Sequence, residues 1–430
     1  MPIGVGDRFN IVVSSNSKQL LLIKLTMNKT LFLTLVAAVA TASPSVAQDS
    51  TLIRLVSQHR YTMEPSGTGL AGSGWDKLQA SITKSQFVLV GEDHGTAQIP
   101  QFVQAVARVQ QPAAFVAEID QYQAEELTRL TAQAGFPTAY FKANPGSLSF
   151  YSWGEEFELA RQLRAQKAQL IGIEQVGVFT IGHFYAQLAG QVKSKAVKAY
   201  LQRHAALYQA RDLVTTRTGG EGYSMFVQRQ LTVDSLVALV QPESSGVRQM
   251  VQNYVASYRI YQGQIAGTSG HQERINLMKR NLLQSLKPYQ TAAGQPLPKL
   301  LFKFGASHMA RVLSPWSGIT DVGNLVQNLA DIQDARSLHL LVMGKQGTHA
   351  GGFNPDDSSK NAAAYDLATE PFLKPFTDLT TGVAWQVFDL RPARRALLSD
   401  KLHLANQTLA GIILGYDYVV IIPQTTAGRS

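Results

Sequence analysis

Ionisable side chains suited to acid–base chemistry follow four short apolar runs of this sequence. They are Glu92 with His94, then Glu118, Glu174 and His308. A carboxylate can orient an imidazole or hold a water molecule while the imidazole moves a proton, which is general acid–base catalysis. If these side chains share one pocket, we expect them to perform this kind of catalysis.

The same side chains are also ligands for a divalent metal, and His94, His308 and Glu92 are the first candidates. The residue types alone leave both uses open. Other chemistries lack their motifs, since the sequence has no cysteine and no Gly-x-Ser-x-Gly, His-Glu-x-x-His or Walker-type phosphate pattern. Residues 67–72 match a dinucleotide fingerprint, but residues 63–66 before them do not resemble a strand, so we expect a loop there.

Seven short apolar runs without strict alternation indicate strands covered on both faces. They lie at 87–90, 114–117, 170–173, 300–304, 338–343, 385–388 and 418–422. Helical patterns separate several of them, for example at 98–110, 121–134 and 154–166. We therefore predict an α/β fold with a mostly parallel sheet and helices on both of its faces. The carboxyl ends of parallel strands meet at one edge, where the ionisable side chains would come together.

The pattern of elements divides the chain into three parts. Residues 48–176 form a first α/β half and residues 291–430 a second, while 177–290 predict a helical insertion without a convincing strand. Within the insertion, amphipathic stretches occupy 184–211 and 245–264. The two halves are loosely similar, because in each a strand is followed by Gly and His, at 90–94 and at 304–308.

One basic side chain of the insertion is expected to reach the site. Arg274, Met278 and Asn281 recur on one face of a helical pattern, so Arg274 can point inward and clamp an anion; the alternative, which is the commoner outcome for an arginine, is a solvated side chain or a salt bridge. His349 follows another strand and is expected to be a bystander. Residues 351–361 are rich in turn-forming residues, which predicts an exposed loop near the site, either a lid or a mobile connection.

The N-terminal region predicts export. Residues 27–47 combine a basic start, an apolar stretch of about ten residues and small residues, as in a signal peptide cleaved after Ala47. Residues 1–26 resemble an upstream extension. The apolar stretch is too short to be a stable membrane anchor, so we expect a periplasmic or secreted protein. Removal of residues 1–47 takes away four basic residues and one acidic residue and leaves a net charge of +6, too scattered for nucleic-acid binding.

Several motifs occur in the order seen in erythromycin-esterase-like proteins. They are the turn at 91–96, the strand that ends in Glu118, the helix with Arg274, and the Phe304–His308 segment; Trp153, Glu156 and residues 388–391 also fit. The chain resembles that family, or the wider Tiki superfamily that includes the Tiki metalloproteases and the ChaN-type haem-binding uptake proteins. The resemblance covers about residues 80 to 425.

The resemblance implies a hydrolase in which a histidine activates a water to open an ester without a metal. Glu92, His94, Glu118 and His308 match pocket residues of the esterases, and Arg274 matches an inward-facing arginine. A single residue, Asp93, separates Glu92 from His94, a spacing closer to the ChaN-type turn than to the esterases. Haem or metal binding in the same pocket is therefore the alternative function. We expect a small-molecule substrate, and the sequence leaves cofactor, substrate and oligomeric state open.

Overall fold

A computed structural model describes residues 44–219, 222–290 and 295–429 of the chain. The predicted extension at 1–26 and most of the predicted signal segment lie outside these residues. The predicted cleavage position after Ala47 falls inside the first described helix, α1 (Pro44–Gln58). Within the described residues, no helix has the length and apolar character needed to cross a membrane.

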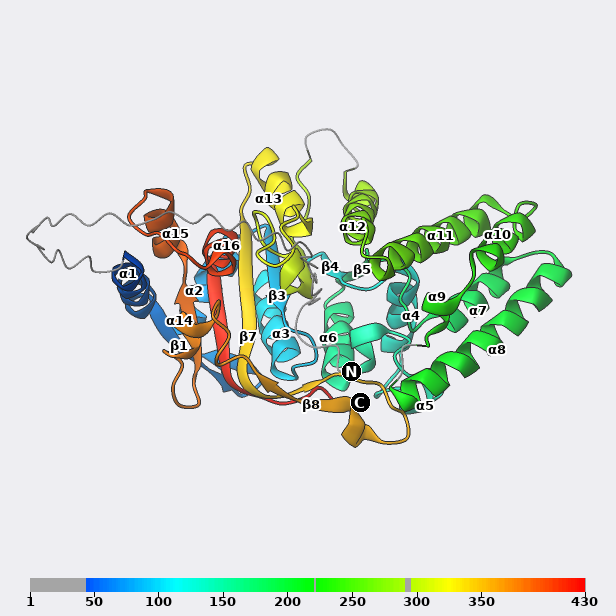
Figure 1. Ribbon diagram of the computed structural model, residues 1–430, viewed down its shortest axis with the longest axis horizontal. Coiled ribbons are helices and arrows are strands. Elements are labelled where there is room, and N and C mark those ends of the chain that lie inside the picture. Colours follow the sequence, from blue (N-terminus) through cyan, green and yellow to red (C-terminus); the bar gives the residue numbers. More distant parts are fainter. Residues whose placement is uncertain (1–43, 220–221, 291–294, 430) are drawn as a thin grey trace, which may run out of the picture.

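A ten-stranded mixed sheet forms the centre of the described part of the chain, in the order β2-β1-β9-β10-β7-β3-β6-β4-β5, with β8 paired to β7 (Figure 1). Its strands are β1 (Arg60–Ser66), β2 (Gly69–Ala71), β3 (Phe87–Glu92), β4 (Ala114–Ala117), β5 (Gln169–Gly172), β6 (Leu300–Gly305), β7 (Ser337–Ala350), β8 (Ala362–Asp366), β9 (Trp385–Asp389) and β10 (Tyr418–Thr425). The neighbours from β10 to β5 pair in parallel, whereas β1, β2, β8 and β9 join antiparallel. All seven predicted strands are present, and the mostly parallel sheet is confirmed.

The expectation for residues 63–72 was wrong. Residues 63–66 belong to β1, and Gly69–Ala71 form β2, so this segment is a β-hairpin. In a dinucleotide fingerprint the glycine turn opens directly into a helix, whereas here Gly69–Ala71 within the match form strand β2 and helix α2 begins only at Ser73. The exposure of β1 explains why this strand was missed, since only Met63 is buried and its other side chains are exposed or half-buried.

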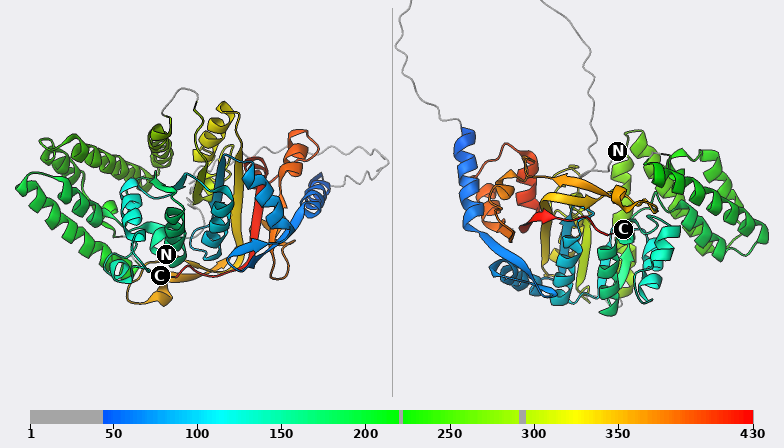
Figure 2. Two further views of the ribbon diagram at one scale, coloured as in Figure 1. Left: turned by 180° about the vertical axis from the view of Figure 1, so that it is seen from behind. Right: turned by 90° about the horizontal axis from the view of Figure 1, so that it is seen from below.

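Helices cover both faces of the sheet, as predicted. One face packs against α2 (Ser73–Thr83), α3 (Gln98–Gln110), α4 (Gln121–Thr131), α5 (Thr138–Ala143) and α6 (Gly154–Ala165). The other packs against α1, α12 (Gly270–Leu286), α13 (Val322–Ile332), α14 (Lys374–Thr377), α15 (Arg391–Leu398) and α16 (Gln407–Gly415) (Figure 2). Strand side chains alternate between these layers, so Leu89 faces one core and Val90 the other. This double burial explains the uninterrupted apolar runs.

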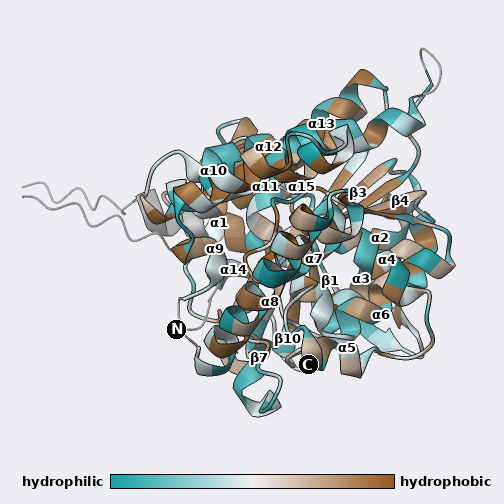
Figure 3. Ribbon diagram, turned by 90° about the vertical axis from the view of Figure 1, so that its right-hand side faces the viewer, coloured by the Kyte–Doolittle hydropathy of each residue, from teal (hydrophilic) through white to brown (hydrophobic). Residues whose placement is uncertain are grey.

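The helical region stands beyond the β5 end of the sheet (Figure 1). It contains α7 (Ile181–Gln191), α8 (Lys195–Thr218), α9 (Ser224–Val227), α10 (Gln230–Leu239) and α11 (Ser245–Ile265), and α12 leads back to the sheet. Figure 3 shows hydrophilic and hydrophobic residues along the same helices, which suits helices with one buried side. The predicted stretch 184–211 is two helices, because the Glu243 carboxylate accepts hydrogen bonds from the backbone of Lys193 (2.8 Å) and Ser194 (3.0 Å) at the break.

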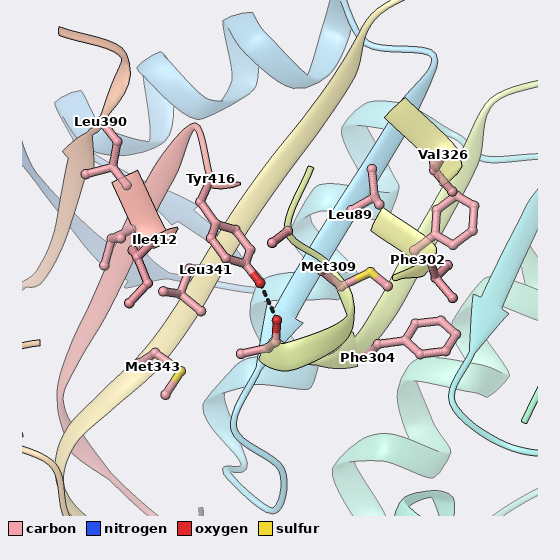
Figure 4. Packing of buried hydrophobic residues seen from close by; sticks show 14 of the residues in the cluster. Leu89, Phe302, Phe304, Met309, Val326, Leu341, Met343, Leu390, Ile412 and Tyr416 are labelled. Atoms are coloured by element: carbon pink, nitrogen blue, oxygen red, sulfur yellow. Dashed lines mark hydrogen bonds between the residues drawn. The ribbon is translucent and has the colours of Figure 1, made fainter. Parts of the chain in front are cut away.

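The two α/β halves of the sequence share one sheet. Strand β6, from the C-terminal half, lies between β3 and β4 of the N-terminal half. The short 3-10 turn η3 (Ala306–His308) follows β6 directly, and the buried Tyr416 hydroxyl donates a hydrogen bond to the Ala306 carbonyl (Figure 4). Further 3-10 turns are η1 (Ser149–Ser152), η2 (Lys287–Tyr289) and η4 (Ser358–Asn361). This interleaving places the Gly-His segments of both halves at the same edge.

Candidate active site

The predicted site residues come together at the carboxyl edge of four neighbouring strands. Glu92 is the last residue of β3, Glu118 follows β4 directly, Glu174 lies two residues beyond β5, and His308 ends η3 after β6. Because the strand order is β3-β6-β4-β5, the residues that follow these four strands are adjacent in space. The parallel arrangement of the strands therefore assembles the cluster, as expected from the sequence.

His94 lies between two buried carboxylates. Its Nδ1 is 2.7 Å from Glu92 Oε1, and its Nε2 is 3.4 Å from Glu118 Oε2. The Phe150 ring stacks on the imidazole with centroids 3.7 Å apart, which fixes the ring plane. Gly95 follows with φ of +88°, and a Cβ there would lie 2.2 Å from the Ala350 carbonyl oxygen. This turn therefore needs glycine, and it aims His94 into the site.

Glu118 is the centre of the cluster. Its Oε2 accepts a hydrogen bond from the Gly305 backbone N–H (2.6 Å), and its Oε1 accepts one from Arg274 Nη2 (2.8 Å). His308 Nε2 lies 3.3 Å from Oε1, and His94 Nε2 approaches Oε2. A carboxylate surrounded by donors in this way is held in its ionised form. Glu118 thus links strands β4 and β6 with helix α12.

Arg274 points inward from α12, as the helical pattern predicted. Its Nε and Nη2 lie 3.0 Å and 2.6 Å from Glu174 Oε2, and Nη2 also reaches Glu118. About two turns further along the helix, Asn281 Nδ2 donates to the Ile173 carbonyl (2.9 Å) and ties α12 to the end of β5. The guanidinium therefore clamps two carboxylates of the protein in this conformation.

Four residues of the cluster were absent from the predicted catalytic set. His308 Nδ1 lies 2.9 Å from Asp321 Oδ2, and Asp321 also caps α13 by accepting a hydrogen bond from the Val322 backbone. Lys303, in β6, contacts Glu92 and lies 2.7 Å from Glu156 Oε1. The fourth is Phe150. The visible signal for Lys303 was a lysine inside an apolar strand run, because such a buried charge requires partners, and Glu156 had appeared among the residues of the family resemblance.

Comparison with solved structures gives the fold relationship. An erythromycin esterase variant, EreC in its open conformation, superposes with a TM-score of 0.51 at 13% identity, covering 82% of this chain and 94% of that one. The fold is that of an erythromycin esterase. A Bacillus cereus protein gives a TM-score of 0.52 at 14% identity over 89% of this chain and 98% of its own length. A succinoglycan biosynthesis protein gives 0.52 at 11% identity over 89% and 99%.

These likenesses confirm the predicted fold relationship. No protein-family model matches the chain, and no curated protein matches it in sequence. At identities of 11–14% the similarity concerns the erythromycin esterase fold alone. The chemistry must therefore be argued from the residues of this chain.

The protonation of the cluster follows from its contacts. Burial alone would lower the pKa of His94, but hydrogen bonds with Glu118 and Glu92 outweigh it and raise that pKa to about 9. Burial opposes the charge of His308 in the same way, yet Asp321 and Glu118 raise its pKa to about 10. Burial raises the pKa of Glu118, but His308 and His94 hold it well below its usual range. Both imidazoles are therefore cations at neutral pH.

These contacts decide how well the candidate metal ligands fit. Both nitrogens of His94 and both nitrogens of His308 face carboxylates, so a metal could reach either imidazole only by displacing one of these contacts. Within the described ranges, no three His, Asp or Glu side chains are grouped so that they could hold a metal ion. The arrangement of His94, His308 and Glu92 fits an ionic network better than a metal or haem-iron site.

Four other histidines, at 183, 204, 271 and 349, are not members of this cluster. His349, in β7, is buried with its ring centroid 5.4 Å from that of Tyr365, apart from the carboxylates of the site. His271, in α12, has its ring 6.5 Å from His308. His183 and His204 lie in α7 and α8. Of these four, His271 is the one whose ring lies beside a histidine of the site.

A row of aromatic rings leads from His94 to the helical region. Phe150 lies 5.9 Å from Trp153, which stacks on Phe353 at 5.2 Å, and Phe353 lies 5.6 Å from Phe179. Phe353 belongs to the predicted loop 351–361. On the outside of the same loop, Asp356 pairs with Arg217 of α8 at 2.6 Å. The loop therefore joins the site to the helical region.

Proposed function

We propose that this protein is a hydrolase that acts on an ester or a related carbonyl compound, with His94 as the group that moves the proton. The observation that carries the proposal is the exposure of His94. Its side chain is 25% exposed, whereas those of Glu92, Glu118 and His308 are 1%, 8% and 3% exposed. Among the charged side chains of this cluster, the imidazole is the most exposed to solvent and substrate, followed by Arg274 at 15%.

The contacts assign different roles to the two nitrogens of His94. Nδ1 is held at 2.7 Å by Glu92, whereas Nε2 has the longer contact of 3.4 Å with Glu118. Nε2 is therefore the nitrogen that can exchange its carboxylate contact for a water. In the reaction, the deprotonated form of His94, which is the minor form at neutral pH because its pKa is raised to about 9, takes a proton from this water at Nε2 as the oxygen bonds to the carbonyl carbon. When the carbon–oxygen bond of the ester breaks, Nε2 returns the proton to the leaving alkoxide.

The neighbouring cations support the other half of this reaction. Addition of water to a carbonyl places negative charge on its oxygen, and a fixed positive charge lowers the barrier to that step. Arg274 and His308 both lie against Glu118, on the side of the cluster opposite Glu92. We assign them the stabilisation of this charge, while Glu118 and Glu174 hold Arg274 in place.

The setting of this activity is also a proposal. The segment 27–47 has the composition of a cleavable signal peptide, and we infer that the protein works in the periplasm or outside the cell. The partner is a small molecule. The esterase likeness supports this reading through the fold alone.

The test is hydrolysis of a panel of esters and lactones by the purified protein. We expect His94→Ala to lower kcat/KM by about 10²–10⁴-fold, the usual contribution of a positioned acid–base group. His204→Ala is the matched control, because this half-buried histidine lies in α8 and packs on Tyr200. Equal rates for wild type and His94→Ala would refute the proposal.

Two further measurements distinguish ester hydrolysis from the alternative function, which is metal or haem binding. Loss of hydrolysis in chelator that returns with a divalent metal would assign the site to metal chemistry. A haem titration that produces a Soret change in wild type and not in His94→Ala would favour haem capture. We expect neither, because the imidazole nitrogens already face carboxylates.

A further inference from the structure

The pair of Lys303 and Glu156 lies behind the site, on the inner side of Glu92. Lys303 extends from the middle of β6, and Glu156 from the first turn of α6. Their side chains are 2% and 3% exposed. Burial of an ion pair costs several kcal/mol per ion, and apolar residues of similar size often stabilise a protein as well or better. Stability of the fold therefore does not explain why charges lie here.

We propose that Lys303 and Glu156 are positioning residues of the site: Lys303 holds Glu92 against His94, and Glu156 sets the net charge behind that imidazole. The inference rests on the proposed function in one respect, since both concern the proton on His94. It deepens that function by naming the residues that determine how firmly this proton is held.

The geometry supports this role through an unbroken line of opposite charges. The members of this line, in order, are Asp321, His308, Glu118, His94, Glu92, Lys303 and Glu156. From Asp321 to Glu92, the successive nitrogen–oxygen distances between neighbours are 2.9, 3.3, 3.4 and 2.7 Å. Lys303 then contacts Glu92 and lies 2.7 Å from Glu156. The signs alternate along the whole line. A change of charge at the Glu156 end therefore acts on His94 through Lys303 and Glu92.

The Glu156 carboxylate has an oxygen that lacks a hydrogen-bond partner among the described residues. Its Oε1 contacts Lys303, but its Oε2 is buried and has no hydrogen-bond partner among the described residues. Burial raises the pKa of Glu156 to about 7, although Lys303 lowers it. The titratable groups around it are Lys303 of β6, Glu92 of β3, His94 in the turn after β3, and Tyr151 of η1.

The decisive variant is Glu156→Gln, which keeps the shape and removes the charge. Lys303 then keeps Glu92 as its remaining carboxylate partner, and the net charge behind His94 becomes more positive, so His94 should lose its proton more easily. We expect the titration midpoint of His94 to fall by about one pH unit, the size of a unit charge acting over several ångströms inside a protein. The midpoint is measured by NMR on the full chain with labelled histidine side chains, and His94→Gln assigns the His94 signal.

The matched control is Glu158→Gln in the same helix. Glu158 lies two residues further on, pairs with Arg161 at 2.7 Å and is 41% exposed, so its charge is screened by solvent. We expect the midpoint of His94 to stay unchanged in this variant. Equal midpoints in wild type and Glu156→Gln, or equal shifts in Glu156→Gln and Glu158→Gln, would overturn the proposal.

A second variant tests the opposite sign. Lys303→Met removes the cation and leaves Glu92 and Glu156 facing one another, so the midpoint of His94 should rise. If this variant fails to fold, Glu156→Gln alone decides. No substrate enters these titrations, so a failure of the ester hydrolysis and a failure of this inference remain distinguishable. Where a substrate is found, we expect Glu156→Gln to shift the pH profile of kcat in the direction of the NMR midpoint.

Discussion

The sheet edge and the helical region each contain a buried polar network, and the two networks differ in kind. At the sheet edge the partners are charged, from Asp321 to Glu156. In the helical region, Gln228 gathers neutral hydroxyls: its Nε2 donates to Tyr208 (2.9 Å) and Tyr185 (3.4 Å), and the Tyr254 and Tyr258 hydroxyls donate to its oxygens. Both networks are interior, but only the charged one has a member open to solvent.

This difference separates a structural role from a chemical one. Neutral hydrogen bonds satisfy buried groups at moderate net gain and hold helices in register. Charged networks cost more to bury, and their protonation states are pulled far from ordinary values. Burial raises the pKa of Tyr208, so the neutral network keeps its protons well into the alkaline range. We therefore expect pH to act on the sheet edge and to leave the helical region alone.

The largest expected effect is the loss of stability at high pH. The pKa values of His94 and His308 are raised to about 9 and about 10, above the ordinary value of 6.5. A group whose pKa is higher in the folded protein stabilises the folded state fully at pH values below its pKa in the unfolded chain. This stabilisation is lost as the pH rises through the pKa in the folded protein. Between pH 8 and 10, the deprotonation of each imidazole should lower the unfolding free energy of the protein by on the order of 1–3 kcal/mol.

Denaturant unfolding at pH 8 and pH 10 measures this loss. His94→Gln is the comparison, because it removes one of the two titrations and leaves every tyrosine and lysine in place. We expect the variant to lose less stability than wild type over this interval. The same loss in both proteins would mean that His94 holds no extra proton, and the contrast between the two networks would weaken.

The next effect concerns the neutral network. Gln228→Leu removes the side-chain amide that contacts Tyr185, Tyr208 and Tyr254 and leaves their hydroxyls without this partner in the interior, whereas Tyr258 keeps its bond to the backbone carbonyl. We expect a loss of about 2–4 kcal/mol in unfolding free energy, with kcat/KM of the folded protein in the ester assay unchanged. Unfolding at neutral pH and the ester assay measure the two quantities. A drop in activity with native stability would show that the helical region takes part in the chemistry.

The smallest effect concerns the ion pair that joins the two regions. Asp356 and Arg217 have side chains that are 53% and 45% exposed. Exposed pairs contribute about 0.2–1 kcal/mol, and salt screens them. Asp356→Asn should therefore change the unfolding free energy by less than about 0.5 kcal/mol. A larger loss that persists in high salt would show that the loop at 351–361 is a firm bridge between the regions.

The sequence predicted the sheet edge well because parallel strands impose a simple rule. The carboxyl ends of parallel strands lie at one edge of the sheet. The residues that follow Val90, Ala117 and Ile173 were therefore expected to lie close together at that edge. Arg274 followed from helical periodicity. The pairing partners of these residues did not follow, since Asp321 resembles an ordinary helix cap and Glu156 an ordinary helical surface residue. Their burial depends on how α13 and α6 pack, which local patterns do not encode.

The strands that the sequence analysis did not predict were missed for a different reason. β1, β2 and β8 are short or polar elements at the periphery, with one or no buried side chain along most of their length. Such strands form because a neighbour offers free backbone groups, as β7 does for β8. The placement of β6 between β3 and β4 was likewise not predicted, because this strand order depends on contacts between residues 213 and 186 positions apart, Phe87 with Leu300 and Ala114 with Leu300.

The stacking of Phe353 on Trp153 makes the chain its own optical reporter. Of the four tryptophans, Trp153 is the one stacked on the 351–361 loop, with its indole N–H directed at the Gly352 carbonyl at 3.4 Å. A displacement of this loop would expose that indole to water and shift its emission to longer wavelength. The fluorescence of a protein in which Trp153 is the only tryptophan would therefore show, without any label, when a ligand enters or leaves the site.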